Sequence, residues 1–183
     1  SVKVPFIARH PGRIPAGVVC DSLVSAYDFM PTLLDYLGLK PLDMAKRPGV
    51  SFVPALLGQD FERPGGIVGM DEYGPNRMLR DQRYKYIARY PYGPNALYDL
   101  KADPGEQDNL LAHGGFEALE QELRGRLEKW FAKYVNPEID GAREAVFGSG
   151  QIGLAGLWGA GVSAHSCDDY IKKNPNYALY RVK

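Results

Sequence analysis

The sequence predicts an α+β fold in which a four-stranded antiparallel sheet is packed by one long helix. Three observations predict it. Short segments with strand-like composition follow one another between residues 66 and 100, each bounded by turn residues. An amphipathic helical pattern comes soon after them, at residues 116–134. A polar, break-prone segment at residues 59–65 separates both from an earlier stretch that has its own strand and helix signals.

The strand pattern is clearest between residues 83 and 90. Tyr84, Tyr86 and Ala88 fall on one face of this segment and alternate with the residues of the other face. Asp81 and Gln82 supply the turn that precedes it. The predicted strands are residues 67–70, 76–80, 83–90 and 96–100.

The helix at residues 116–134 carries one apolar stripe. The apolar face of such a sheet must be buried against another element, and this stripe is the surface in the sequence that is suited to pack on it. Burial of its six side chains stabilises the fold by about 10 kcal/mol before chain entropy is subtracted. The stripe consists of Leu119, Leu123, Leu127, Trp130, Phe131 and Tyr134.

The first sixty residues have a different pattern. Residues 4–8 have the composition of a short buried strand. Ser25 and Asp28 have the spacing of a capping box, in which each side chain satisfies a free backbone N–H of the other residue. The helix that follows ends at Gly38, because glycine adopts the left-handed conformation of a C-cap at little cost. Residues 49–58 form one or two further helical turns.

These patterns divide the chain into three parts: residues 1–60, residues 61–135 with the sheet and its helix, and residues 136–183. The last part is rich in glycine and contains short apolar units between the glycines. We therefore expect an extended tail that packs on another surface, with a terminal strand within residues 174–183.

A turn is expected where the fourth strand ends. Asp103 can bond the backbone at the first turn position, and Pro104 presets φ at the second. Gly105 takes the positive φ at the third position, so the chain turns back toward the helix.

Composition excludes several classes of partner. Lys and Arg number 22 and Asp and Glu also number 22, which argues against a nucleic-acid partner. No apolar run approaches the ~20 residues of a membrane helix. Cys20 and Cys167 are expected to be free thiols. Nothing distinguishes a cytoplasmic from a periplasmic location.

Five segments, taken in order, resemble motifs of the sulfatase family. The resemblance covers residues 1–134 and is strongest at the Leu-Tyr-Asp-Leu strand with its Asp-Pro-x-Glu turn and Asn-Leu. In the first segment His10 stands where the family usually has Trp. The segments are VPFIARHPGRIPAG, SLVSAYDFMPTLLDYLGL, GVSFVPALLG, NRMLRDQRYKYI and ALYDLKADPGEQDNLL.

The resemblance implies an alkaline phosphatase-like architecture. Residues 1–60 would be the end of its large α/β domain, and residues 61–135 its small C-terminal subdomain. It also implies a formylglycine nucleophile, made from Cys or Ser in a Cys/Ser-x-Pro-x-Arg motif, and a divalent cation, expected to be calcium. Neither Cys20 nor Cys167 begins such a motif. No catalytic or metal-binding residue is therefore transferred to this chain. We expect it to be inactive alone, its partner being the missing N-terminal portion of the enzyme.

Six residues are candidates for contact with a sulfate ester substrate. Five lie in or beside the loop that joins the first two strands: Asp71, Glu72, Tyr73, Asn76 and Arg77. The alternative for them is a solvated turn. His10 follows the strand expected at residues 4–8 and could line the substrate cleft. A hydrogen-bonded structural histidine is the simpler interpretation.

Two alternative functions stay open at this point. The same motifs fit a phosphonate or phosphate monoester hydrolase of the same superfamily. A non-catalytic module is the other alternative, in which residues 138–183 are exchanged between subunits of a homo-oligomer.

Overall fold

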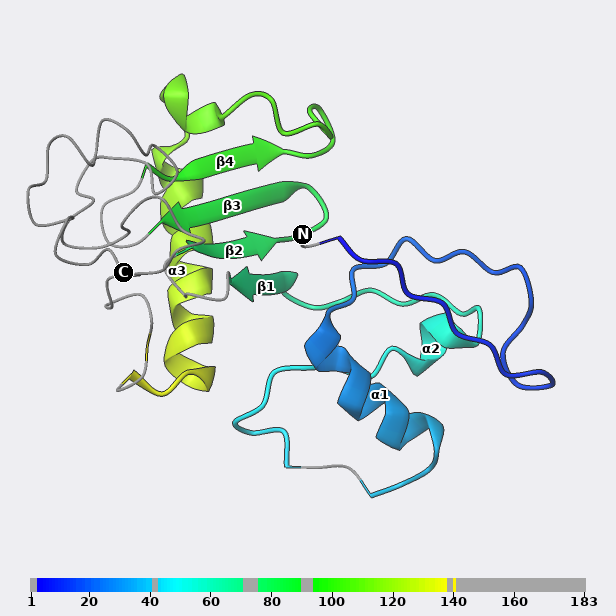
Figure 1. Ribbon diagram of the computed structural model, residues 1–183. Coiled ribbons are helices and arrows are strands. Elements are labelled where there is room, and N and C mark those ends of the chain that lie inside the picture. Colours follow the sequence, from blue (N-terminus) through cyan, green and yellow to red (C-terminus); the bar gives the residue numbers. More distant parts are fainter. Residues whose placement is uncertain (1–2, 41–42, 71–75, 90–93, 138–139, 141–183) are drawn as a thin grey trace, which may run out of the picture. The chain divides into compact units, whose positions relative to one another are not determined.

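The computed structural model describes residues 3–40, 43–70, 76–89, 94–137 and 140. The chain forms two compact units, Ser1–Ile67 and Val68–Lys183. The predicted boundary at residues 59–65 lies just before this division. The first unit carries short helices, and the second carries the sheet and a long helix (Figure 1).

The second unit is built on a four-stranded antiparallel sheet with the strand order β1-β2-β3-β4. Its register places Leu79 opposite Tyr86, and Tyr86 opposite Leu97. The prediction of this sheet is confirmed, with strands that end within about a residue of the expected positions. They are β1 (Ile67–Met70), β2 (Asn76–Arg80), β3 (Tyr84–Arg89) and β4 (Ala96–Asp99).

Helix α3 (Glu117–Tyr134) crosses one face of this sheet (Figure 1). Leu123, Leu127 and Phe131 of the predicted stripe are buried, whereas Leu119 and Trp130 pack at the margin of the core. Each large side chain that is fully buried contributes about 1.5–3 kcal/mol. From the sheet, the core receives Val68, Leu79, Tyr86, Ala88 and Leu97.

The first unit contains short helices joined by long connections. A 3-10 turn, η1 (Ala26–Asp28), leads into α1 (Phe29–Tyr36), and α2 (Val53–Leu56) follows. Gly38 has φ 63° and Leu39 N–H donates to the carbonyl of Leu34, so the predicted C-cap is confirmed. Within the described residues, no helix combines the length and apolar character that a bilayer-spanning segment needs.

Two predictions about local structure are wrong. Residues 4–8 form no strand, and Val4 and Ile7 are 71% and 90% exposed. A strand needs a neighbour for its N–H and C=O groups, and the described part of the chain provides none there. In the turn after β4, the positive φ belongs to Glu106, at 56°, and not to Gly105.

Some predictions lie outside the described residues. They concern the tail beyond Asp140, including the terminal strand at residues 174–183, and Cys167. Cys20 is a free, exposed thiol.

Candidate functional site

His10 lies in the first unit against the end of α1. Its Nδ1 is 2.7 Å from the hydroxyl of Tyr36, and the two rings meet edge to face at 5.8 Å. The guanidinium of Arg13 lies 4.4 Å from the centre of the same Tyr36 ring and donates to the Tyr36 carbonyl at 3.2 Å. His10 and Arg13 are both exposed. The structure therefore gives His10 a hydrogen-bonded place beside an aromatic ring and a cation.

Asn76 and Arg77 lie in the second unit, at the start of β2. Arg77 is buried; its guanidinium lies 3.8 Å from the centre of the Phe131 ring and forms an ion pair with Asp140. Asn76 is half-buried and faces Arg89 across the ladder between β2 and β3. The Arg77 guanidinium thus connects the sheet, helix α3 and the segment that follows the helix.

The other three candidates, Asp71, Glu72 and Tyr73, lie outside the described residues. The two units are not placed relative to each other. His10 belongs to the first unit, and Asn76 and Arg77 belong to the second.

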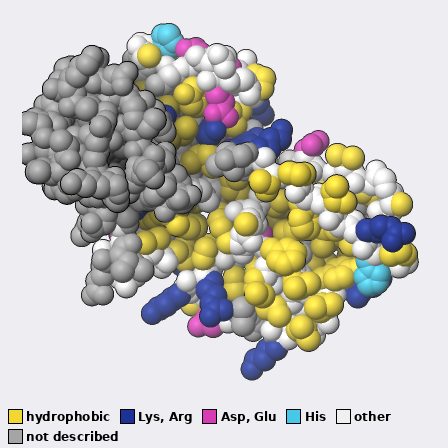
Figure 2. All heavy atoms as spheres, viewed as in Figure 1, with side chains coloured by type: hydrophobic (Ala, Val, Ile, Leu, Met, Phe, Trp, Pro, Cys, Tyr) yellow, Lys and Arg dark blue, Asp and Glu magenta, His cyan; other side chains and the backbone are white. Residues whose placement is uncertain are grey.

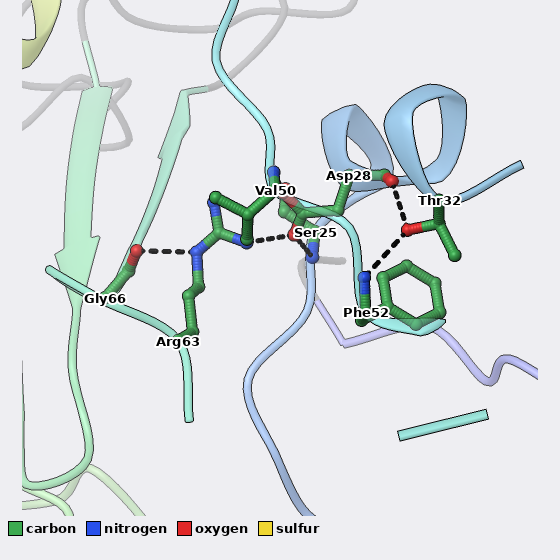
Figure 3. A network of polar contacts seen from close by, with 7 residues as sticks. All are labelled: Ser25, Asp28, Thr32, Val50, Phe52, Arg63 and Gly66. Carbon is green, nitrogen blue, oxygen red and sulfur yellow. Dashed lines mark hydrogen bonds and ion pairs between the residues drawn. The ribbon is translucent and has the colours of Figure 1, made fainter. Parts of the chain in front are cut away.

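A buried ion pair that sequence reasoning missed joins Asp28 to Arg63 (Figure 3). The Asp28 side chain is fully buried and that of Arg63 is 6% exposed. Asp28 also accepts the backbone N–H groups of Ser25 at 2.7 Å and Val50 at 2.9 Å. Arg63 Nε donates to the carbonyl of Gly66 at 2.8 Å. The pair thus links η1 to the segment that leads into β1.

Thr32 extends this network within the first unit (Figure 3). Its hydroxyl donates to the Asp28 carbonyl at 2.6 Å and accepts the N–H of Phe52 at 3.0 Å. The sequence signal for this network was the Ser25–Asp28 spacing, and the capping bond that it predicts to the Ser25 N–H is present. Nothing in the spacing pointed to Arg63, which is 35 residues away.

Two carboxylates organise the turns of the small sheet. Burial of Asp81 acts to raise its pKa, but the N–H groups of Tyr84 and Arg83 and the Arg126 guanidinium outweigh burial and hold the pKa below its ordinary value. The Arg83 guanidinium, 2.7 Å from Asp99, lowers the pKa of that carboxyl. Both groups act in the ionised form that accepts hydrogen bonds.

The described residues offer little for chemistry at a metal. Among them, no group of three or more His, Cys, Asp or Glu side chains could hold a metal ion. The described part of the chain provides an exposed His10–Tyr36–Arg13 cluster and several ion pairs that are partly or wholly buried. They include Arg63–Asp28, Arg77–Asp140 and Lys85–Glu106.

Comparison with known proteins gives a consistent result. A family model described as "N-sulphoglucosamine sulphohydrolase, C-terminal" matches residues 1–133. An ulvan-active sulfatase of Formosa agariphila is 31% identical, over 71% of this chain and 33% of that protein. A Δ4,5-hexuronate-2-O-sulfatase of Bacteroides thetaiotaomicron is 32% identical, over 72% of this chain and 29% of that protein. The chain therefore spans about a third of the length of the curated relatives it matches.

Solved structures agree on the architecture. One, of a protein in complex with its substrate D-glucosamine-2-N,6-O-disulfate, has a TM-score of 0.59 and 26% identity, over 74% of this chain and 29% of that one. A phosphonate monoester hydrolase from Silicibacter pomeroyi has a TM-score of 0.55 and 18% identity, over 78% of this chain and 31% of that one. The second likeness shows the fold alone. Both place the chain in the alkaline phosphatase-like architecture.

Proposed function

This chain belongs to the sulfatase family and represents the C-terminal part of a sulfatase, and from this membership we propose that the complete protein hydrolyses sulfuric esters. The observation that carries the proposal is the family match over residues 1–133, together with sulfatase relatives that are 31% and 32% identical. The proposed role of this portion is to complete the enzyme's fold and one wall of its substrate pocket.

The surface of the first unit supports the proposed role in completing the fold. Large apolar side chains lie exposed there, and Figure 2 shows hydrophobic side chains gathered over the unit that carries α1 and α2. Exposed apolar clusters of this kind mark surfaces that pack against another part of a protein. We propose that the preceding part of the enzyme covers them. They are Val4, Phe6, Ile7, Val18, Val19, Phe29, Met30, Leu33, Leu37 and Leu39.

The nucleophile and the cation are proposed to belong to that preceding part. The described residues do not fit a metal site, because they hold no suitable cluster of ligands. A formylglycine would supply the nucleophile, and a divalent cation, calcium, would polarise the ester oxygens. It follows that this chain alone is inactive toward sulfate esters.

The proposed substrate is a sulfate ester carried on a saccharide. The relatives include an ulvan-active sulfatase and a hexuronate-2-O-sulfatase, which favours this class over simple aryl sulfates. Asp71, Glu72, Tyr73 and Asn76 are proposed to contact the organic part of the substrate from the connection between β1 and β2, with Arg77 and His10 as further candidates. The contacts of Arg77 with Phe131 and Asp140 favour a positioning role for its guanidinium.

The proposal is tested with the full-length protein. We expect turnover of an aryl sulfate and release of inorganic sulfate from sulfated saccharides, loss of both with a metal chelator, and no turnover by the 183-residue chain. An Asn76→Ala variant is expected to raise KM for the saccharide more than KM for the aryl sulfate, because the aryl ester lacks the sugar. Efficient turnover of a phosphonate monoester, with no release of sulfate, would overturn the proposal.

A further inference from the structure

The face of the small sheet that points away from α3 carries unusual charges. Leu79, Tyr86 and Leu97 point toward α3, so their alternating neighbours occupy the other face, here called the second face. In Figure 2 basic side chains lie over the sheet near the turn between β2 and β3, beside an acidic one. The second face contains Met78, Arg80, Lys85, Ile87, Arg89, Ala96 and Tyr98.

Arg80 differs from the neighbouring arginines in the hydrogen bonding of its side chain. Its Nε is buried and, within the part of the chain that the structure describes, finds no hydrogen-bond partner. The other arginines nearby are bonded: Arg77 to Asp140, Arg83 to Asp99 and Arg89 to the carbonyl of Pro94. A buried donor without a partner carries the full cost of its desolvation, and this cost is greater for a charged group. Such an atom in a native protein requires an explanation.

The surroundings of Arg80 add a second anomaly. The register places it directly opposite Lys85, so two cations face each other on neighbouring strands, an arrangement that is destabilising. The Lys85 ammonium is paired with Glu106 at 2.5 Å, and its side chain is only 12% exposed. Glu106 therefore balances the charge of Lys85, and no carboxylate among the described residues pairs with Arg80.

The second face is also closed to water at its centre. Met78 is 8% exposed and Ala96 is 2% exposed, although neither points toward α3. Arg80 itself is half-buried at the end of β2 with its Nε enclosed, and this partial desolvation strengthens the attraction between its guanidinium and an opposite charge. The planar guanidinium fork fits the two oxygens of a carboxylate.

We propose that Arg80 is a docking residue, and that its partner is a carboxylate side chain of the preceding part of the sulfatase chain. The inference rests on the proposed function, because the matched region covers only 33% and 29% of the two sulfatase relatives, which therefore contain a large part that this chain does not match. The half-buried apolar residue Ile87, on the same face as Arg80, would share the interface. The ion pair forms only when the two parts of the enzyme fold together.

The test compares Arg80→Gln in two proteins, the 183-residue chain and the full-length enzyme, by thermal unfolding. In the full-length enzyme the melting temperature is expected to fall by about 3 °C or more, because the substitution leaves a buried carboxylate without its partner. Arg80→Lys is expected to recover part of the loss. In the 183-residue chain Arg80→Gln is expected to leave the melting temperature unchanged or to raise it.

The matched control is Arg124→Gln, which removes an arginine from the exposed side of α3, where it pairs with Glu128. It should have little effect in either protein. A destabilised 183-residue chain would place the partner of Arg80 within the chain, and an unchanged full-length enzyme would show that no partner exists. Either result overturns the inference. A crystal structure of the full-length enzyme gives an independent result, in which a carboxylate within about 4 Å of the guanidinium is expected and solvent alone is the contrary outcome.

Failure of the proposed function is detected by a measurement that is independent of the Arg80 variants. It appears as absent sulfate-ester turnover by the wild-type full-length protein, and that measurement does not involve Arg80. Turnover without the expected changes in melting temperature would overturn the inference alone, and those changes without turnover would overturn the proposed function alone.

Discussion

The Nζ of Lys85 lies 2.5 Å from Oε2 of Glu106, and this pair fixes the loop that follows β4 to the middle of the sheet. Glu106 has φ 56°, which makes it the non-glycine residue with positive φ among those that the structure describes. Left-handed backbone costs a residue with a Cβ about 1–2 kcal/mol. The ion pair offsets this cost and holds the Asp-Pro-Gly-Glu turn in place.

Substitutions at Glu106 should separate the stabilisation that the ion pair with Lys85 supplies from the free-energy cost of the left-handed backbone. Glu106→Ala removes the pair and keeps the left-handed conformation, so we expect the free energy of unfolding to fall by about 1–3 kcal/mol. Glu106→Gly also removes the pair but relieves the backbone, and it should retain about 0.5–1 kcal/mol more stability than Ala. Urea unfolding of the chain measures both. Equal stability of the two variants would mean that the positive φ carries no cost.

Replacement of the Arg63–Asp28 pair by apolar residues should lower the free energy of unfolding, whereas the same replacement of an isolated buried ion pair is often neutral. Arg63→Met leaves the Asp28 charge buried, and we expect a loss of about 3–5 kcal/mol. Replacing Asp28 by Leu as well should not restore stability, because the N–H groups of Ser25 and Val50 then lose their acceptor. Urea unfolding of the two single variants and the double variant gives the coupling energy. A double variant as stable as the wild type would contradict this account.

Asp81 should make the small sheet sensitive to acid. Its folded-state pKa lies below the ordinary value of 3.8, so its contribution to stability is present above that value and is lost as pH falls through the folded-state pKa. The difference in unfolding free energy between the wild type and Asp81→Asn should be constant above about pH 5 and should shrink below about pH 4. Urea unfolding between pH 2.5 and 7 measures it. A difference that grows on acidification would reverse the sign and contradict the assignment.

Asn109 bonds β4 on the side away from β3. Its Oδ1 accepts the N–H groups of Leu97 at 3.0 Å and Leu111 at 3.2 Å, and its Nδ2 donates to the Asn95 carbonyl at 3.2 Å. Asn109→Ala should cost about 1–3 kcal/mol, because backbone groups in and beside the largely buried strand β4 lose their partners. Asn109→Asp keeps the acceptor and loses the donor, so we expect a smaller cost. Urea unfolding ranks the variants, and equal losses would show that the Oδ1 contacts contribute nothing.

The sheet and its helix could be predicted because local periodicity determines them. Alternation in residues 84–88 and the stripe from Leu119 to Tyr134 each define one buried face, and the two faces pack on each other. Residues 4–8 show the limit of this reasoning. Their apolar composition favours a strand, but a strand also requires a neighbour, which local sequence does not specify.

The charged contacts were beyond prediction because they join residues far apart in the sequence. Arg63 and Asp28 are 35 residues apart, Lys85 and Glu106 are 21 apart, and no local pattern pairs them. For Asp103-Pro104-Gly105, turn statistics favoured positive φ at glycine, whereas the long-range bond to Lys85 stabilises it at Glu106. Of the six candidate contact residues, His10, Asn76 and Arg77 have described surroundings, and their contact with substrate stays a prediction.

The side-chain amide of Asn109 has a consequence for the behaviour of the isolated chain. It takes the place of a neighbouring strand along the outer edge of β4, where Leu97 and Asn95 would otherwise present a free donor and acceptor. Exposed edges of this kind template intermolecular β-pairing and aggregation. Asn109 thus protects the edge of the sheet against self-association, and variants without this side chain should form β-rich aggregates more readily.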